Sequence, residues 1–104
     1  MRKLTVKRKW SFVECVTRPD LYVQCFKKSK ASLRADDMLF ENVGKLKNGK
    51  EITVDIPDEE IVVLLAVGKM QAALRVPSGE NDVALLVKAH YTPAKGNPFS
   101  IECI

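Results

Sequence analysis

The chain of 104 residues has the length of one domain and can bury a single hydrophobic core without disulfides or metals. Apolar residues make up 46% and charged residues 29%, a balance that excludes wholesale disorder. No apolar run reaches the ~20 residues that a membrane-spanning helix needs, and none follows the basic residues 1–10 as it would in a signal peptide. We therefore expect a single domain spanning residues 1–104 that acts in the cytoplasm.

The formal net charge of +4 is distributed unevenly. Residues 1–34 carry ten Lys or Arg against two acids, whereas residues 35–104 carry seven against eleven. Such a split can mark an anionic partner, or two surfaces that attract each other within or between chains. A solvated face is the simpler interpretation of a charge run.

The first predicted strand is residues 3–7, where apolar and polar residues alternate with a period of two. If the alternation continues, Lys3, Lys7 and Lys9 face solvent. The even positions then face the core: Leu4, Val6, Trp10 and Phe12.

Residues 21–26 predict the next strand. Tyr22 and Phe26 share a face with Lys28, so they are the best candidates for exposed aromatic rings beside a positive charge, although packing in the core is the favoured alternative. The candidate binding surface of the sequence is therefore Lys3, Lys7, Lys9, Tyr22, Phe26 and Lys28.

The stretch of residues 43–56 resembles a phosphate-binding loop in its glycines and lysines only. Gly44 and Gly49 are separated by four residues and Lys50 follows, but the next residue is Glu51 rather than Ser or Thr, and a strand of period two follows in place of a helix. Asn48-Gly49 is a strong signal for a type I′ β-hairpin, because both central positions of that turn need positive φ. We predict a structural hairpin turn at Asn48 and Gly49.

Two continuous apolar runs, residues 61–67 and 83–87, predict central strands that are covered on both faces, and residues 99–103 predict a last strand. Residues 58–75 are compatible with a helix, because residues 69–74 are good helix formers. The β-branched residues 61–63 and the interruption at Gly68 favour two strands instead. The pattern predicts an all-β fold: a single antiparallel β-sandwich of about seven to nine short strands.

Chemistry-bearing clusters are not recognisable. Cys15, Cys25 and Cys103 have no C-x-x-C spacing, and His90 has no partner at a zinc-ligand spacing. No serine lies in a nucleophile-elbow context. We predict no catalytic residues, no metal site and no cofactor, and an enzyme is the minority interpretation.

One resemblance adds to this reading. The layout from Leu21-Tyr22-Val23 through the turn of residues 43–50 to Ile56-Pro57 resembles PEGA-like β-sandwich domains of bacteria, although the P-E-G-A signature itself is absent. Residues 76–82 and 93–99 are similar to uncharacterised small proteins of Gram-positive bacteria. The resemblance implies a sandwich with a binding or scaffolding role and transfers no catalytic residues.

These observations predict a non-catalytic protein-interaction or scaffolding module that associates with an unknown protein partner, including itself as a dimer, and has no contact with a membrane. The alternative is a binder of nucleic acid or another polyanion that uses the basic N-terminal strands. It would recruit Lys3, Lys7, Arg8, Lys9 and residues 27–30. The predicted strand phase disfavours this alternative, because it sets the lysines and the aromatic rings on opposite faces.

Overall fold

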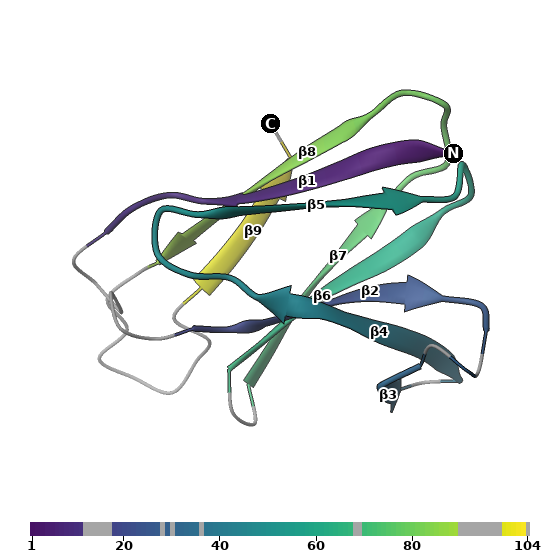
Figure 1. Ribbon diagram of the computed structural model, residues 1–104, viewed down its shortest axis with the longest axis horizontal. Coiled ribbons are helices and arrows are strands. Elements are labelled where there is room, and N and C mark those ends of the chain that lie inside the picture. Colours follow the sequence, from purple (N-terminus) through teal and green to yellow (C-terminus); the bar gives the residue numbers. More distant parts are fainter. Residues whose placement is uncertain are drawn as a thin grey trace.

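The computed structural model describes residues 1–11, 18–27, 29, 31–35, 37–67, 70–89 and 99–103. Within these residues it contains nine β-strands and no α-helix. The strands are β1 (Arg2–Arg8), β2 (Asp20–Cys25), β3 (Leu33–Ala35), β4 (Met38–Lys45), β5 (Glu51–Ile56), β6 (Ile61–Val67), β7 (Met70–Val76), β8 (Val83–Ala89) and β9 (Phe99–Cys103). They lie in two packed layers (Figure 1).

The layers are a four-stranded sheet with the order β5-β1-β8-β9 and a five-stranded sheet with the order β3-β4-β2-β6-β7. This confirms the predicted all-β sandwich. One pairing differs from the antiparallel expectation, because β1 and β8 run parallel, with Leu4 opposite Val83 and Arg8 opposite Val87. Parallel neighbours need a long crossover connection, here most of the chain, and local turn signals do not reveal such a pairing.

Strand β1 has the predicted alternation, but it ends earlier than the sequence pattern indicates. Leu4 and Val6 are buried and Lys3 and Lys7 are exposed. The strand stops at Arg8, so the phase does not extend to Trp10, whose side chain is 56% exposed. The prediction that Trp10 faces the core is therefore wrong, and Phe12 lies outside the described residues.

The two ends of β1 bury arginines on the core face. Arg2 is 4% exposed and donates hydrogen bonds to the carbonyl oxygens of Pro57, Glu59 and Pro77, at 3.1, 3.1 and 2.8 Å. Arg8 is 1% exposed; its Nη1 donates to the Leu46 carbonyl at 3.0 Å, and its guanidinium carbon lies 4.7 Å from the centroid of the Phe99 ring. Burial of a charge requires such partners. Arg8 is consequently not available to a polyanion, as the nucleic-acid alternative requires.

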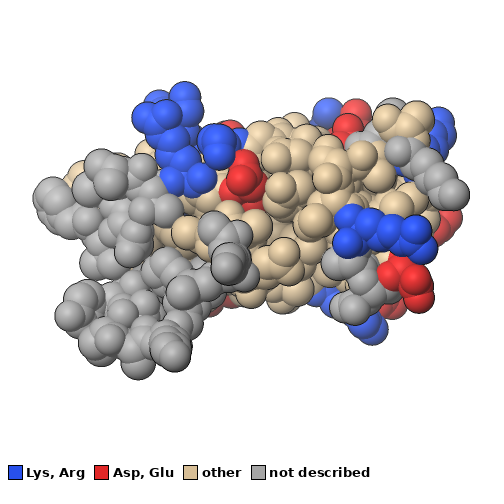
Figure 2. All heavy atoms as spheres, turned by 90° about the horizontal axis from the view of Figure 1, so that it is seen from below, with Lys and Arg blue, Asp and Glu red and all other residues tan. Residues whose placement is uncertain are grey.

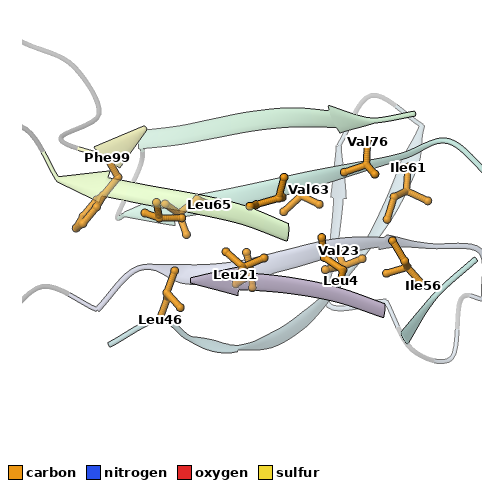
Figure 3. Packing of buried hydrophobic residues seen from close by; sticks show 13 residues of the cluster. Leu4, Leu21, Val23, Leu46, Ile56, Ile61, Val63, Leu65, Val76 and Phe99 are labelled. Carbon is orange, nitrogen blue, oxygen red and sulfur yellow. The ribbon is translucent and has the colours of Figure 1, made fainter. Parts of the chain in front are cut away.

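The core lies between the sheets and draws on both (Figure 3). Every strand except β3 and β4 contributes a buried residue to this core, and β7 contributes only its last residue, Val76. Leu46, in the loop after β4, completes the core. The buried residues are Leu4, Val6, Leu21, Val23, Leu46, Ile56, Ile61, Val63, Leu65, Val76, Leu85, Val87 and Phe99.

Within the range 58–75, residues 61–67 form β6 and residues 70–75 belong to β7, and the two strands pair antiparallel from Ile61 opposite Val76 to Val67 opposite Met70. The choice of strands over a helix is confirmed.

β6 and β8 each lie between two other strands, as predicted. The middle of β6 is covered on both faces, because Leu65 faces the core and Leu64, on the opposite face, is only 6% exposed. In β8 the coverage is one-sided: Leu85 and Val87 are buried and their neighbours are half-buried.

The turn at Asn48-Gly49 exists, but it does not close a hairpin. Lys50 N donates to Lys47 O at 3.0 Å, as in a β-turn, and Gly49 has φ 73°. Asn48 does not have the positive φ that a type I′ turn needs. The flanking strands β4 and β5 belong to different sheets, so the turn carries the chain from one layer to the other. Consecutive strands that do pair antiparallel across a short connection are β3 with β4, where Ala35 pairs with Met38, and β6 with β7, where Val67 pairs with Met70.

Candidate functional site

The lysines of β1 face solvent, as predicted, but acids of β5 lie opposite them. Lys3 pairs with Asp55 in the register, and their Nζ and Oδ1 atoms are 3.4 Å apart. Lys7 lies opposite Glu51. Lysines from the basic first third of the chain therefore lie beside acids from the remainder within one molecule. As a result, this face does not carry a continuous positive charge.

The two predicted aromatic candidates lie on different surfaces. Tyr22 is half-buried on the outer face of the five-stranded sheet, in a row with Asn42, Leu64 and Ala73. Phe26 follows the end of β2, where the alternation no longer applies, and is 58% exposed. Lys28 lies outside the described residues. The two rings therefore do not form one exposed aromatic surface.

The outer face of the five-stranded sheet is uncharged in its middle. Figure 2 views the molecule from this side and shows an uncharged (tan) area between a red-and-blue group near the middle and further charged groups at the right-hand end. At the borders they form ion pairs: Lys45 Nζ lies 3.2 Å from Asp20 Oδ1, and Arg75 Nε lies 3.0 Å from Glu60 Oε1.

A cleft opens between the two sheets on the side where β4 and β5 meet, and we call it the β4–β5 cleft. The strands are close at one end, where a Cβ on Gly44 would lie 3.5 Å from Ile52 Cδ1. Toward the other end they separate and enclose a pocket of about 460 Å³. Its lining comprises Met1, Val23, Gln24, Cys25, Phe26, Lys27, Glu41, Val43, Val54, Asp55, Ile56 and Pro57.

The walls of the β4–β5 cleft are mainly apolar, with a few polar groups. Val43 of β4 and Val54 of β5 line the cleft from the two sheets, and both pack against the core. Glu41 of β4 lies opposite the core residue Val23 of β2 in the register. Its carboxylate side chain is therefore on the inner face of the five-stranded sheet. A volume of this size with apolar walls and few polar groups is typical of a binding site.

The mouth of the cleft carries exposed apolar side chains. Phe26 is 58% exposed and Met1 is 87% exposed, and both line the cleft. β5 is an edge strand, so the backbone on the side away from β1 has no strand partner among the described residues. Edge strands are places where further chains can pair unless charge prevents it.

The described residues contain no group of three or more His, Cys, Asp or Glu that could hold a metal ion. His90 and Cys15 lie outside the described residues, and Cys25 and Cys103 are free thiols. Nothing in this part of the chain indicates catalysis. No helix among the described residues is long and apolar enough to cross a membrane.

No protein-family model matches the chain, and neither the curated proteins nor the solved structures contain a match. In its described part the chain is a nine-stranded β-sandwich with a mainly apolar cleft between the two sheets, beside β4 and β5. Sequence analysis did not find this cleft, because its existence depends on how far β4 and β5 separate. The one available signal was Glu41, an acid in a strand position that the alternation assigns to the inner face.

Proposed function

We propose that this chain is a non-catalytic protein-interaction module that associates with a second copy of itself through the β4–β5 cleft. The observation that carries the proposal is that an apolar cleft of about 460 Å³ has an exposed phenylalanine, Phe26, on its own rim. A two-fold contact uses one patch of surface on both copies, so that patch must contain both a group to insert and a place to receive it.

Insertion of Phe26 is energetically worthwhile. Burying a fully exposed phenylalanine side chain contributes about 2 kcal/mol, and because Phe26 is 58% exposed its insertion contributes about 1 kcal/mol in each copy. Met1, also exposed beside the cleft, adds further apolar area to the same patch. Glu41 and Lys27 line the cleft as polar groups that can fix the orientation of the second copy.

Pairing of the two β5 edges is the less favourable geometry for a dimer. An antiparallel arrangement centred on Thr53 would set Glu51 opposite Asp55 of the second copy, and like charges directly opposite each other destabilise a strand pair. The acids on β5 therefore protect this edge, and side-chain insertion is the contact that we propose.

The proposal includes the cytoplasm of a bacterium as the place where the module acts. The free thiols of Cys25 and Cys103 are compatible with a reducing compartment. The resemblance to PEGA-like domains stays a prediction and is in keeping with a binding role.

Light scattering with size-exclusion chromatography tests the proposal. We expect a wild-type dimer at both low and high salt, because apolar contacts do not weaken with salt, and a monomer for Phe26→Ser. The matched control is Trp10→Ser, which removes an equally exposed aromatic ring at the other end of β5 and should leave the dimer intact. A wild-type monomer at every concentration up to the solubility limit would overturn the proposal.

A further inference from the structure

Trp10 forms a second surface feature, which the proposed self-association does not use. Its side chain is 56% exposed, yet it is held in place. Ser11 N donates to Asn48 Oδ1 at 3.0 Å and Asn48 Nδ2 donates to Ser11 O at 2.9 Å, so two hydrogen bonds fasten the segment after β1 to the β4–β5 turn. The indole lies against that turn, since a Cβ on Gly49 would be 3.2 Å from Trp10 Cδ1.

Lysines surround this ring. A small cleft of about 180 Å³ is lined by Lys9, Trp10, Ser11, Lys88 and Ala89. On the other side, the turn that holds the indole carries Lys47 and Lys50, both exposed.

The charge at this end is only partly neutralised. Lys88 Nζ is 2.8 Å from Glu102 Oε1. Lys9, Lys47 and Lys50 take part in none of the ion pairs formed between described residues. These three lysines differ in this respect from Lys3, which faces Asp55. The local surface is therefore positive around an exposed, fixed aromatic ring.

We propose that Trp10 with Lys9, Lys47 and Lys50 is a stacking platform for single-stranded nucleic acid. An unpaired base stacks on the indole, and the lysine ammonium groups contact the phosphates on either side of that base. Proteins that bind single strands without sequence preference combine these two elements, because every base has a π-face and every nucleotide has a phosphate. A duplex hides its base faces, so the platform selects single strands.

The sequence pattern disfavoured nucleic-acid binding because alternation extended past Arg8 would place Lys9 and Trp10 on opposite faces. Because β1 ends at Arg8, Trp10 and Lys9 lie on one surface. An anionic membrane is the other polyanion that a tryptophan among lysines could meet. The Cβ, Cγ and Cδ1 atoms of Trp10 lie against Gly49 and a cleft adjoins the residue, so the indole is held at the surface, which suits a planar base better than insertion among lipids.

The test uses the full chain and two readouts. Trp10 is the single tryptophan, so its intrinsic fluorescence reports on stacking directly. Fluorescence anisotropy with a labelled mixed-sequence DNA oligonucleotide, single-stranded or annealed, reports on binding. We expect the single strand to bind more tightly and to quench the tryptophan emission. Three phosphate contacts predict a salt slope of about −2, which weakens binding roughly twentyfold from 50 to 200 mM salt.

The variants separate stacking from charge. Trp10→Ala should weaken single-strand binding about tenfold or more, and Trp10→Phe should restore part of it. Lys47→Gln and Lys50→Gln change exposed side chains. Each should make the dependence of log affinity on log salt concentration shallower, by about 0.7 in slope. Lys3→Gln changes an exposed lysine that is paired with Asp55, so it is the control and should leave oligonucleotide affinity unchanged.

Three results would overturn the proposal: unchanged tryptophan emission on adding the single strand, equal affinity for single strand and duplex, or no effect of Trp10→Ala. Binding to vesicles of anionic phospholipid without binding to the oligonucleotide would also overturn it, in favour of a membrane surface. The dimer expected from the Phe26 cleft is measured separately, so the two proposals can fail independently.

Discussion

Replacement of Arg2 by methionine tests the role of the buried arginines at the ends of β1. Arg2 joins β1 to the loops that follow β5 and β7, through the carbonyl oxygens of Pro57, Glu59 and Pro77. Gly79 N also donates to Asp58 O at 2.8 Å, so the same two loops are bound to each other. Methionine keeps an unbranched apolar side chain at this position and removes every donor of the guanidinium.

The magnitude follows from the partners. A carbonyl left without its donor costs about 1–3 kcal/mol when it is buried. Glu59 and Pro77 are exposed residues, so water can replace part of the loss, and about 1 kcal/mol for each of the three bonds is appropriate. Removing the buried charge relieves a desolvation cost and offsets some of this. We expect a net loss of about 2 kcal/mol, or roughly thirtyfold in the folding equilibrium constant.

Urea unfolding followed by circular dichroism measures this difference. The matched control is Lys3→Met, which also replaces a basic side chain by methionine, one residue later and on the exposed face, and should alter the free energy of unfolding by less than about 0.5 kcal/mol. If Arg2→Met costs no more than Lys3→Met, the hydrogen bonds of Arg2 do not stabilise the fold and the reasoning is wrong.

Further predictions concern the core and the β4–β5 turn, and each is checked by the same unfolding measurement. Leu65→Ala should lower the free energy of unfolding by about 3 kcal/mol, because Leu65 is fully buried in the core, and a loss below about 1 kcal/mol would contradict that packing. Gly49→Ala should cost about 1–2 kcal/mol, since Gly49 has φ 73° and its new Cβ would press on Trp10; a neutral result would contradict the turn geometry. Asn48→Ala should cost about 1–2 kcal/mol, because it removes both hydrogen bonds to Ser11. It should also change the tryptophan emission, and an unchanged emission would contradict the role of these bonds in holding Trp10.

The strands that sequence analysis located well are those with an unbroken local pattern. β5 alternates without a fault, and β6 is an apolar run with turn residues before it, so their bounds agree with the predicted ranges 51–56 and 61–67. β3 has three residues, too few for a period to be visible, and was missed. The burial of Arg2 and Arg8 could have been predicted, because both occupy even positions of β1, on the same face as Leu4 and Val6.

The features that sequence analysis missed depend on contacts between distant residues. Trp10 was assigned to the core because the alternation of β1 was extended past Arg8, and only the tertiary structure determines where that strand ends. The assignment of Asn48-Gly49 to a hairpin was reasonable for a local turn, but the two strands that it joins enter different sheets. The β4–β5 cleft arises from that same separation, and its one local signal was the acid Glu41 at an inner-face position of β4.

Cross-linking from position 26 tests the central claim, that Phe26 of one copy enters the cleft of another. A photoreactive benzoylphenylalanine at this position, in a mixture of isotopically light and heavy protein, distinguishes cross-links between copies from those within one chain. We predict mixed light–heavy products in which position 26 is joined to the cleft walls, Val43 or Val54. Cross-links confined to single chains, or mixed products joined only to the outer sheet faces, would contradict the account.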